Sequence, residues 1–330
     1  MPLISVVIPV HQVEDFLGRC LDSVPAGDGA LVEVIAVDDA STDRSGAILA
    51  ARSGPALTVI RTESAVGPGR ARELGAKEAA GDYVWFVDAD DELAGGALAA
   101  VASELDRLRP DVLIVDYESL YPDGTTAPSG GDLSGPQPTT LAERPALLHL
   151  TMTVWSKIFR RDFLCGLGVP FGPGIHEDVP VSAAALLTAG RIAVLDRVCY
   201  RYRRSRPGSF MAATSDRHFD IFAAYEQIFS ERTVVPPVRA ALFERAIWHY
   251  TTLLPLVPRR RRREFFGRMT ADFARWRPAG FEFPSGPRGV KLRLVGRGAY
   301  RTYTALEPLN GIRVRVRAAG LGFLKRTHWE

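Results

Sequence analysis

Three aspartates directly follow an apolar run near residue 90. Residues 83–87 have the composition of a buried strand, and Asp88, Asp90 and Asp91 come immediately after them. Buried parallel strands end at the carboxyl edge of their sheet, where α/β proteins bind ligands, and acids crowded there repel one another unless a cation neutralises them. Carboxylate oxygens suit Mg²⁺ or Mn²⁺, and such ions usually also hold phosphates. The pattern indicates a metal–diphosphate site, and the alternative is an acidic turn in which Asp91 caps a helix over 93–108.

A second apolar run, 32–37, also ends in acids. Asp38 or Asp39 could accept hydrogen bonds from a nucleobase or a ribose. The same segment could instead do no more than begin the next helix, because residues 41–43 form a good capping sequence. The local sequence leaves both interpretations open.

A glycine-rich turn opens the third helical stretch with the sequence Gly67-Pro68-Gly69-Arg70-Ala71-Arg72. Glycine lets a ligand approach the backbone, and a helix N-terminus favours an anion. Arg70 or Arg72 could pair with a phosphate. The pattern fails as a dinucleotide-binding fingerprint, because Arg72 occupies the place of its third glycine and the turn after the first strand lacks glycine.

Two further acids, Glu177 and Asp178, stand before an apolar helical run at 181–189. Either could take a proton from an acceptor hydroxyl as a general base. The alternative is that they only cap the helix. His176 beside them could be a metal ligand, although a lone histidine is more often structural.

Arginines cluster between 201 and 206, just before Ser209. Strand alternation places Arg201 and Arg203 on one face and Arg204 and Arg206 in the opposite phase. One of these sets could reach a diphosphate.

An alternating series of strands and helices must bring these residues together. Strands are expected over 3–8, 32–37, 57–60, 83–87 and 112–115, with helices over 13–24, 44–52, 68–79 and 93–108. This order predicts an α/β fold with a mostly parallel sheet and helices on both faces. Farther on, the sequence indicates a surface loop at 121–140, helices at 142–150 and 181–189, strands at 192–195 and 198–202, and then helices at 219–229, 238–254 and 262–276.

The bulk properties are those of a globular chain of 330 residues. No run approaches the ~18 apolar residues of a transmembrane helix, and the first residues resemble a strand more than a signal peptide. The 3 cysteines are scattered, as expected for buried thiols in a reducing compartment. We therefore expect a cytoplasmic protein.

Positive charge is concentrated in the last hundred residues. Residues 231–330 contain 21 Lys and Arg against 7 Asp and Glu, including five consecutive arginines from Arg259 to Arg263. Three interpretations compete: a solvated surface, contact with an anionic membrane or a lipid-linked acceptor, and contact with nucleic acid. We expect no nucleic-acid partner, because no nucleic-acid-binding motif accompanies the charge. Homo-oligomer contacts through this region are a further possibility.

Taken together, these motifs resemble those of a family 2 glycosyltransferase of the GT-A fold. The matching segments are 5–11, 37–43, 67–72 and 86–91, in this order, and residues 154–157 with Glu177 and Asp178 extend the match to about residue 210. The chain is similar to the glycosyltransferase domains of actinobacterial teichoic-acid (CDP-glycerol) polymerases. The resemblance implies a GT-A domain at 1–212, with a mixed, mostly parallel sheet, followed by a basic, mostly helical region at 213–330.

The resemblance also implies roles for single residues. The backbone of Pro9 and Val10, with Asp38 and Asp39, would hold the nucleobase and ribose, and Arg70 or Arg72 would lie near the base or phosphates. Asp88, Ala89 and Asp90 form the Asp-X-Asp motif for Mg²⁺ or Mn²⁺, in which Asp90 is the expected direct ligand. Asp178, beside Glu177, would be the catalytic base. The remaining implied residues are Arg204, Arg206 and Ser209 over the diphosphate, and Trp155, Lys157 and His176 toward the acceptor.

The predicted function is an inverting, metal-dependent transfer of a sugar from a nucleotide-diphosphate donor to an acceptor hydroxyl, in cell-wall, polysaccharide or other glycoconjugate synthesis. The acceptor would be lipid-linked or polymeric, and the protein peripheral at the inner face of the cell membrane. Two alternatives stay open: a nucleotidyltransferase acting on a sugar phosphate, and a non-catalytic module that binds nucleotide sugars.

Overall fold

The computed structural model describes residues 3–24, 31–52, 54–131, 133–172, 174–204, 213–231 and 235–306. The chain divides into two compact units, Met1–Phe210 and Met211–Glu330. Each unit has its own core. The predicted domain boundary between residues 212 and 213 stays a prediction, since residues 205–212 lie outside the described part of the chain.

A nine-stranded sheet forms the centre of the first unit, with the order β3-β2-β1-β4-β8-β6-β9-β5 and β7 paired with β6. Its first four strands are mutually parallel: β1 (Leu3–Val10), β2 (Leu31–Asp38), β3 (Leu57–Arg61) and β4 (Tyr83–Phe86). The others are β5 (Glu92–Leu93), β6 (Val112–Leu120), β7 (Thr126–Pro128), β8 (Lys157–Arg160) and β9 (Ile192–Arg203). Strand β8 runs antiparallel between β4 and β6, and β6 is parallel to β9. The predicted mixed, mostly parallel sheet is confirmed.

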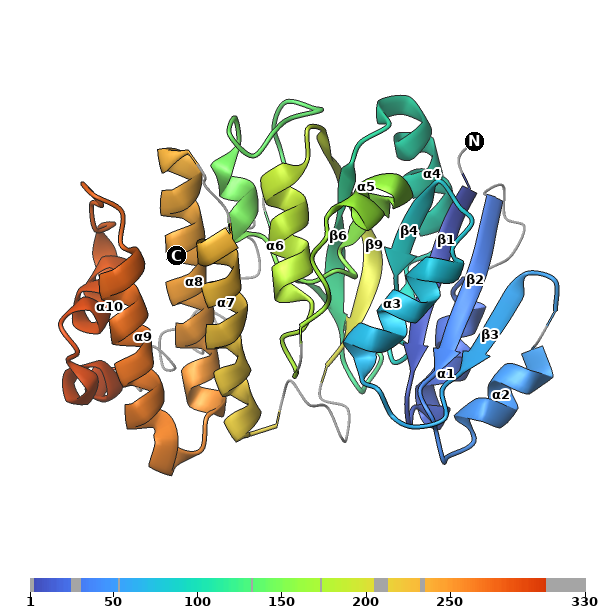
Figure 1. Cartoon of the computed structure of the whole chain (residues 1–330), viewed down its shortest axis with the longest axis horizontal. Coiled ribbons are helices and arrows are strands. Elements are labelled where there is room, and N and C mark those ends of the chain that lie inside the picture. Colours follow the sequence, from blue (N-terminus) through green and yellow to red (C-terminus); the bar gives the residue numbers. More distant parts are fainter. Residues whose placement is uncertain are drawn as a thin grey trace. The chain divides into compact units, whose positions relative to one another are not determined.

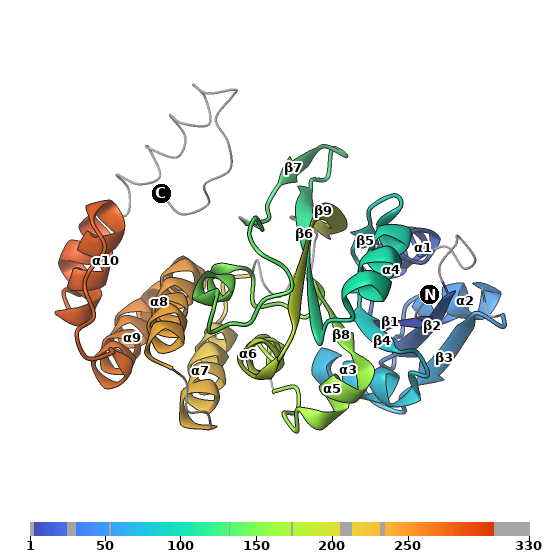
Figure 2. The ribbon, with the colours of Figure 1, turned by 90° about the horizontal axis from the view of Figure 1, so that it is seen from above.

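Helices cover both faces of this sheet (Figures 1 and 2). They are α1 (Glu14–Asp22), α2 (Ser45–Arg52), α3 (Pro68–Glu78), α4 (Ala97–Leu108), α5 (Arg161–Gly166) and α6 (Val179–Thr188). Figure 2 shows α1 and α4 on one side of the sheet and α3, α5 and α6 on the other. Side chains alternate along each strand: Val6 of β1 belongs to the core that includes α1 and α4, and Val7 faces Gly75 of α3.

Several predicted boundaries are wrong. The helix expected over 93–108 begins at Ala97, because Glu92 and Leu93 pair with β9 as strand β5. Gly96 then supplies the left-handed turn, with φ +70°, that starts α4. The two strands expected at 192–195 and 198–202 are the single strand β9, whose register against β6 shifts beside Asp116. Strand β8 was not predicted, and part of the expected loop at 121–140 forms β7.

Helices build the second unit, as predicted, and aromatic side chains pack between them. It contains α7 (Asp220–Glu231), α8 (Pro236–Leu253), α9 (Arg262–Trp276) and α10 (Gly286–Gly296), together with short 3₁₀ turns. Phe222 packs against Tyr250 and Phe265 with ring centroids 4.6 Å away in each case, and Phe229 stacks on Trp276 at 4.4 Å. Among the described residues, no helix combines the length and apolar character needed to cross a membrane.

Candidate active site

The acidic strand ends converge at one edge of the sheet, because β2 and β4 flank β1 in parallel. Val10 pairs with Asp38 at the end of β2, and Val7 pairs with Phe86 at the end of β4. The residues that follow β2 and β4 therefore leave the sheet on either side of the end of β1. The local topology explains why segments that are far apart in sequence share this edge.

Asp38 and Asp39 shape the loops at this edge. Asp39 is buried and accepts hydrogen bonds from the backbone N–H groups of Val66 and Gly67, at 2.7 and 2.8 Å. Asp38 is bonded to Arg61 Nη1 at 2.5 Å and to the Ser41 N–H at 3.0 Å. The Asp39 carboxylate thus already fixes the chain that enters α3, and the Asp38 carboxylate fixes the turn after β2. Their predicted contact with a nucleobase or ribose, together with the Pro9–Val10 backbone, stays a prediction.

Arg72 joins two acidic segments that are far apart in sequence. Its side chain is buried, and it donates to Asp88 Oδ1 at 2.7 Å through Nη2 and to Glu177 Oε1 at 2.5 Å through Nη1. The guanidinium also lies 5.8 Å from the centroid of the Phe171 ring. Nearby acids raise the pKa of Arg72 despite its burial, so it stays charged. Arg70 differs, because it is exposed and paired with Glu73 at 2.6 Å.

The segment Asp88-Ala89-Asp90-Asp91 is fastened to the end of β9. Tyr200 donates its hydroxyl to Asp91 Oδ2 at 2.7 Å and accepts the Asp88 N–H at 3.1 Å. The N–H of Arg203 donates to Asp91 Oδ1 at 2.7 Å, and its Nε donates to the Asp90 carbonyl at 2.8 Å. Asp91 is therefore not the cap of α4, as the sequence had suggested. Sequence analysis missed Tyr200, because an aromatic residue within an apolar strand looks like core.

Asp178 stands immediately before α6 without capping it through its side chain. The Val154 N–H donates to Asp178 Oδ2 at 3.2 Å. Burial raises the pKa of Asp178 to about 7, and the charges of Glu177 and Asp88 add to this effect while Arg72 opposes it. A carboxyl group with such a pKa suits proton abstraction near neutral pH. Its neighbour Glu177 is bonded to Arg72 instead.

The residues expected toward the acceptor are all buried. Lys157 is fully buried, and its ammonium donates to the carbonyls of Thr151 and Thr153 at 2.8 and 2.9 Å. This arrangement gives Lys157 a structural role, and its predicted place toward the acceptor stays a prediction. Trp155 is 5% exposed and stacks on Tyr200 at 4.5 Å, and His176 is 3% exposed. The predicted roles of these two residues stay predictions.

Arg204 follows β9 on the side of β6. Its Nε donates to Ser119 Oγ at 2.9 Å, and its guanidinium lies 4.9 Å from the centroid of the Tyr202 ring. Arg206 and Ser209, the other two residues predicted to cover a diphosphate, lie outside the described residues.

The acidic edge fits a divalent cation that also binds phosphate. Within the described part of the chain, no hydrogen bond reaches Asp88 Oδ2, and the Asp88 side chain is 24% exposed. Burial and the charges of Asp90 and Asp88 raise the pKa of Asp91, and burial followed by these acids raises that of the Cys20 thiol. The neighbouring negative charges that contribute to these shifts are ones that a cation would offset. The described residues contain no group of three or more His, Cys, Asp or Glu side chains placed to hold a metal.

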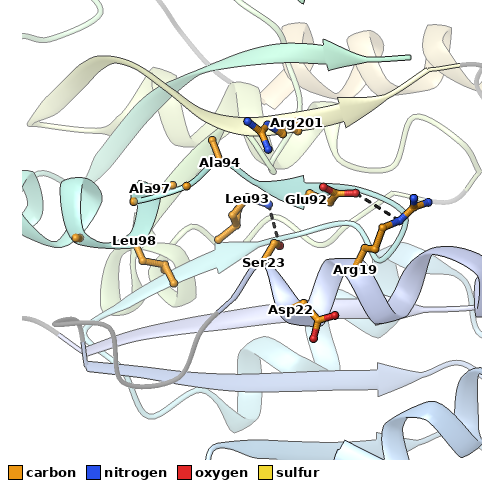
Figure 3. Close-up of a pocket in the computed structure, with 12 residues that line it drawn as sticks. Arg19, Asp22, Ser23, Glu92, Leu93, Ala94, Ala97, Leu98 and Arg201 are labelled. Carbon is orange, nitrogen blue, oxygen red and sulfur yellow. Dashed lines mark hydrogen bonds and ion pairs between the residues drawn. The ribbon is translucent and has the colours of Figure 1, made fainter. Parts of the chain in front are cut away.

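A separate hollow of about 440 Å³ lies between the end of α1, β5 and the start of α4 (Figure 3). Its lining includes Arg201 but none of the residues to which the family resemblance gave a role. Its charged side chains are engaged: Arg19 contacts Glu92 at 3.7 Å, and Arg201 donates to Glu118 at 2.8 Å. We therefore place the candidate active site at the acidic edge.

Comparisons with known proteins match the chain to glycosyltransferases. The family model described as "Glycosyl transferase family 2" matches residues 5–164. The uncharacterized glycosyltransferase EpsJ of Bacillus subtilis is 28% identical over 62% of this chain and 62% of its own length. The succinoglycan biosynthesis protein ExoO of Rhizobium meliloti is 26% identical over 89% of this chain and 87% of its own. The poly(ribitol-phosphate) beta-N-acetylglucosaminyltransferase TarS of Staphylococcus aureus is 30% identical over 63% of this chain, which spans 37% of TarS.

Solved structures support the fold. Residues 1–349 of S. aureus TarS, in complex with UDP-GlcNAc, superpose with a TM-score of 0.73 at 22% identity, over 93% of this chain and 91% of that one. The mannosyltransferase PcManGT of Pyrobaculum calidifontis, in complex with GDP-Man and Mn²⁺, gives a TM-score of 0.57 at 19% identity. The first unit thus has the GT-A architecture that its motifs predicted. Through residues 5–164, the chain belongs to glycosyltransferase family 2.

Proposed function

We propose that this protein transfers a sugar from a nucleotide-diphosphate donor to an acceptor hydroxyl, with inversion at the anomeric carbon. One observation carries the proposal: Arg72 bonds to both Asp88 and Glu177. This bridge joins the Asp-X-Asp segment to the segment that carries Asp178. A metal–diphosphate end and a general base therefore belong to one site, as glycosyl transfer requires.

The donor end lies beside β1, β2 and β4. We assign the nucleobase and ribose to the Pro9–Val10 backbone, Asp38 and Asp39, which flank the end of β1. Asp90, assisted by Asp88, would hold Mg²⁺ or Mn²⁺. When bound, the cation stabilises the charge that develops on the departing diphosphate. Ala89 is buried between the two acids and adds no polar group of its own.

Asp178 would supply the base. The acceptor oxygen attacks the anomeric carbon from the face opposite the diphosphate and passes its proton to Asp178, while the bond from that carbon to the diphosphate oxygen breaks. The nucleoside diphosphate leaves with the bonding electron pair. Glu177 cannot replace Asp178 as it stands, because its carboxylate is committed to Arg72. Displacement on one face by a group on the other inverts the configuration.

The names of the relatives favour an extended acceptor. TarS is named for poly(ribitol-phosphate) and ExoO for succinoglycan biosynthesis. We infer a polymeric or lipid-linked acceptor in cell-wall or polysaccharide synthesis. A cytoplasmic position at the inner membrane face would be consistent with such acceptors.

A donor panel tests the proposal. The protein is incubated with UDP-, GDP-, CDP- and dTDP-sugars, Mn²⁺ and candidate glycan acceptors, and nucleoside diphosphate is measured. We expect acceptor-dependent release of one nucleoside diphosphate and a product of inverted configuration by NMR. Release of pyrophosphate from a nucleoside triphosphate and a sugar phosphate would favour the nucleotidyltransferase. If the protein binds a donor but releases no nucleoside diphosphate with any acceptor tested, the result would favour the non-catalytic binding module.

A further inference from the structure

The end of β9 is hydrogen-bonded to Asp91 of the acidic segment. Both Asp91 oxygens accept hydrogen bonds from β9, one from the Tyr200 hydroxyl and one from the Arg203 N–H, each at 2.7 Å. The same Tyr200 oxygen accepts the N–H of Asp88 at 3.1 Å. We propose that Tyr200 and Arg203 act through Asp91 as positioning residues that fix Asp88 and Asp90 for the metal–diphosphate. This inference rests on the metal role proposed above for these two acids.

Arg203 holds the middle of the same segment. Its Nε donates to the Asp90 carbonyl at 2.8 Å, and its guanidinium forms an ion pair with Glu92. The guanidinium also lies 5.2 Å from the centroid of the Phe16 ring. The backbone on both sides of Asp90 is therefore anchored. Without such anchors, mutual repulsion would spread neighbouring acids apart.

The Tyr200 side chain is held in one position by its packing. Its side chain is fully buried, and its ring stacks on Trp155 with centroids 4.5 Å apart and planes 16° apart. The hydroxyl is thus delivered to Asp88 and Asp91 by a rigid ring. Removing only this oxygen keeps the packing and releases the segment. We expect that change to weaken metal binding more than it weakens the fold, as is usual for groups that orient metal ligands.

The chain offers a matched control two residues along the same strand. Tyr202 also stacks on Trp155, at 5.5 Å. Among the described residues its hydroxyl makes no hydrogen bond, and its contact with Arg204 is through the ring. Tyr202→Phe therefore removes the same atom from the same strand without touching the acidic segment.

Measurements of Mn²⁺ affinity test the proposal. Free Mn²⁺ is measured by EPR in titrations of the full chain with Mn²⁺ alone, and with Mn²⁺ plus UDP or GDP. For Tyr200→Phe we expect an Mn²⁺ dissociation constant about 10–100-fold higher than wild type, and for Tyr202→Phe a change under about twofold. Asp90→Asn should remove Mn²⁺ binding. In turnover assays, excess Mn²⁺ should restore kcat of Tyr200→Phe to within about threefold, because positioning raises the metal requirement and leaves the chemistry intact.

Other outcomes overturn it. Wild-type Mn²⁺ affinity in Tyr200→Phe, or a kcat loss that excess Mn²⁺ does not restore, refutes the positioning role while leaving the proposed transfer standing. If wild type itself binds no Mn²⁺ in any titration, the metal assignment fails and the inference fails with it. Should Tyr200→Phe not fold, as judged by its unfolding transition, Asp91→Asn decides, because its amide leaves only one of the two oxygens that accept hydrogen bonds from β9. Unchanged Mn²⁺ affinity in Asp91→Asn would likewise refute the proposal.

Discussion

Glu177 and Asp178 are adjacent acids that the sequence could not tell apart, and their surroundings in the fold differ. Glu177 is buried and bonded to Arg72 at 2.5 Å, so its charge is compensated. Asp178 receives the Val154 N–H, and its pKa is raised to about 7. A carboxyl group with a raised pKa suits proton abstraction near neutral pH. The different partners of the two acids therefore favour a structural role for Glu177 and the proposed base for Asp178.

We expect Asp178→Asn to remove transfer and keep donor binding. An amide cannot take the acceptor proton, so kcat should fall about 10²–10⁴-fold. Calorimetry should show unchanged affinity for the donor nucleotide. The unfolding temperature should be unchanged or higher, because the variant no longer buries a charge. Turnover above about a tenth of wild type would contradict the assignment of the base.

The raised pKa of Asp178 gives stability a specific pH dependence. The native state binds this proton more tightly than the unfolded chain, so protonation stabilises the fold. That contribution is complete below the unfolded-state pKa of an aspartate and is lost as pH rises through about 7. Urea unfolding without metal should therefore show wild type losing stability relative to Asp178→Asn as pH rises from the unfolded-state pKa to about 7, with little further change above it. A constant difference from acid to neutral pH would contradict the shift.

At the scale of elements, α3 determines how the site is assembled. The helix lies directly on the sheet because residue 75 is glycine: a Cβ there would come 2.4 Å from Val7 Cγ1. A Cβ at Gly69 would come 2.8 Å from Phe171 Cβ and 3.0 Å from Glu177 Cγ. These close approaches bring Arg72 between Asp88 and Glu177. Gly69, which the sequence placed in a possible phosphate-binding turn, thus serves helix packing.

We expect Gly75→Ala to destabilise the first unit by about 1–3 kcal/mol, because the added methyl overpacks the contact with β1. Gly18→Ala is the matched control, since Gly18 also lies in a helix and its Cβ would be 3.6 Å from Arg52 Nη2, an ordinary contact. That control should stabilise by about 0.5–1 kcal/mol. Urea denaturation of both variants is the measurement, and equal midpoints would contradict the packing argument.

At the scale of the whole molecule, the basic charge of the second unit is partly used inside it. Arg261 pairs with Glu264 at 2.6 Å, and Arg262 donates to the Val257 carbonyl at 2.9 Å. Arg260 reaches Asp216 at 3.3 Å. Arg259 and Arg263 are exposed and have no ion pair within the described residues. The membrane proposal for this run of arginines therefore rests mainly on these two.

We expect the protein to bind vesicles that contain an anionic phospholipid and to lose affinity in the double variant Arg259→Gln, Arg263→Gln. At about 1 kcal/mol per charge, two charges correspond to about a 30-fold loss. Co-sedimentation measures it, with Arg297→Gln, Arg301→Gln as a control pair of exposed arginines from the same unit. Equal losses in both pairs would indicate only diffuse attraction. Absence of binding by wild type would refute the membrane contact.

The sequence by itself determined the α/β order, the acidic strand ends and the candidate base, because strand periodicity and motif spacing are local properties. It also indicated the family through the order of four motifs. Only the tertiary structure determined which side chains from distant parts of the sequence bond to one another. Arg72 meets Glu177 across 105 positions, and Tyr200 meets Asp91 across 109. No local pattern reveals such pairs, because packing of α3 and pairing within the sheet create them. Lys157 is a further case: the family resemblance implied a place toward the acceptor, and the fold encloses its ammonium among backbone carbonyls.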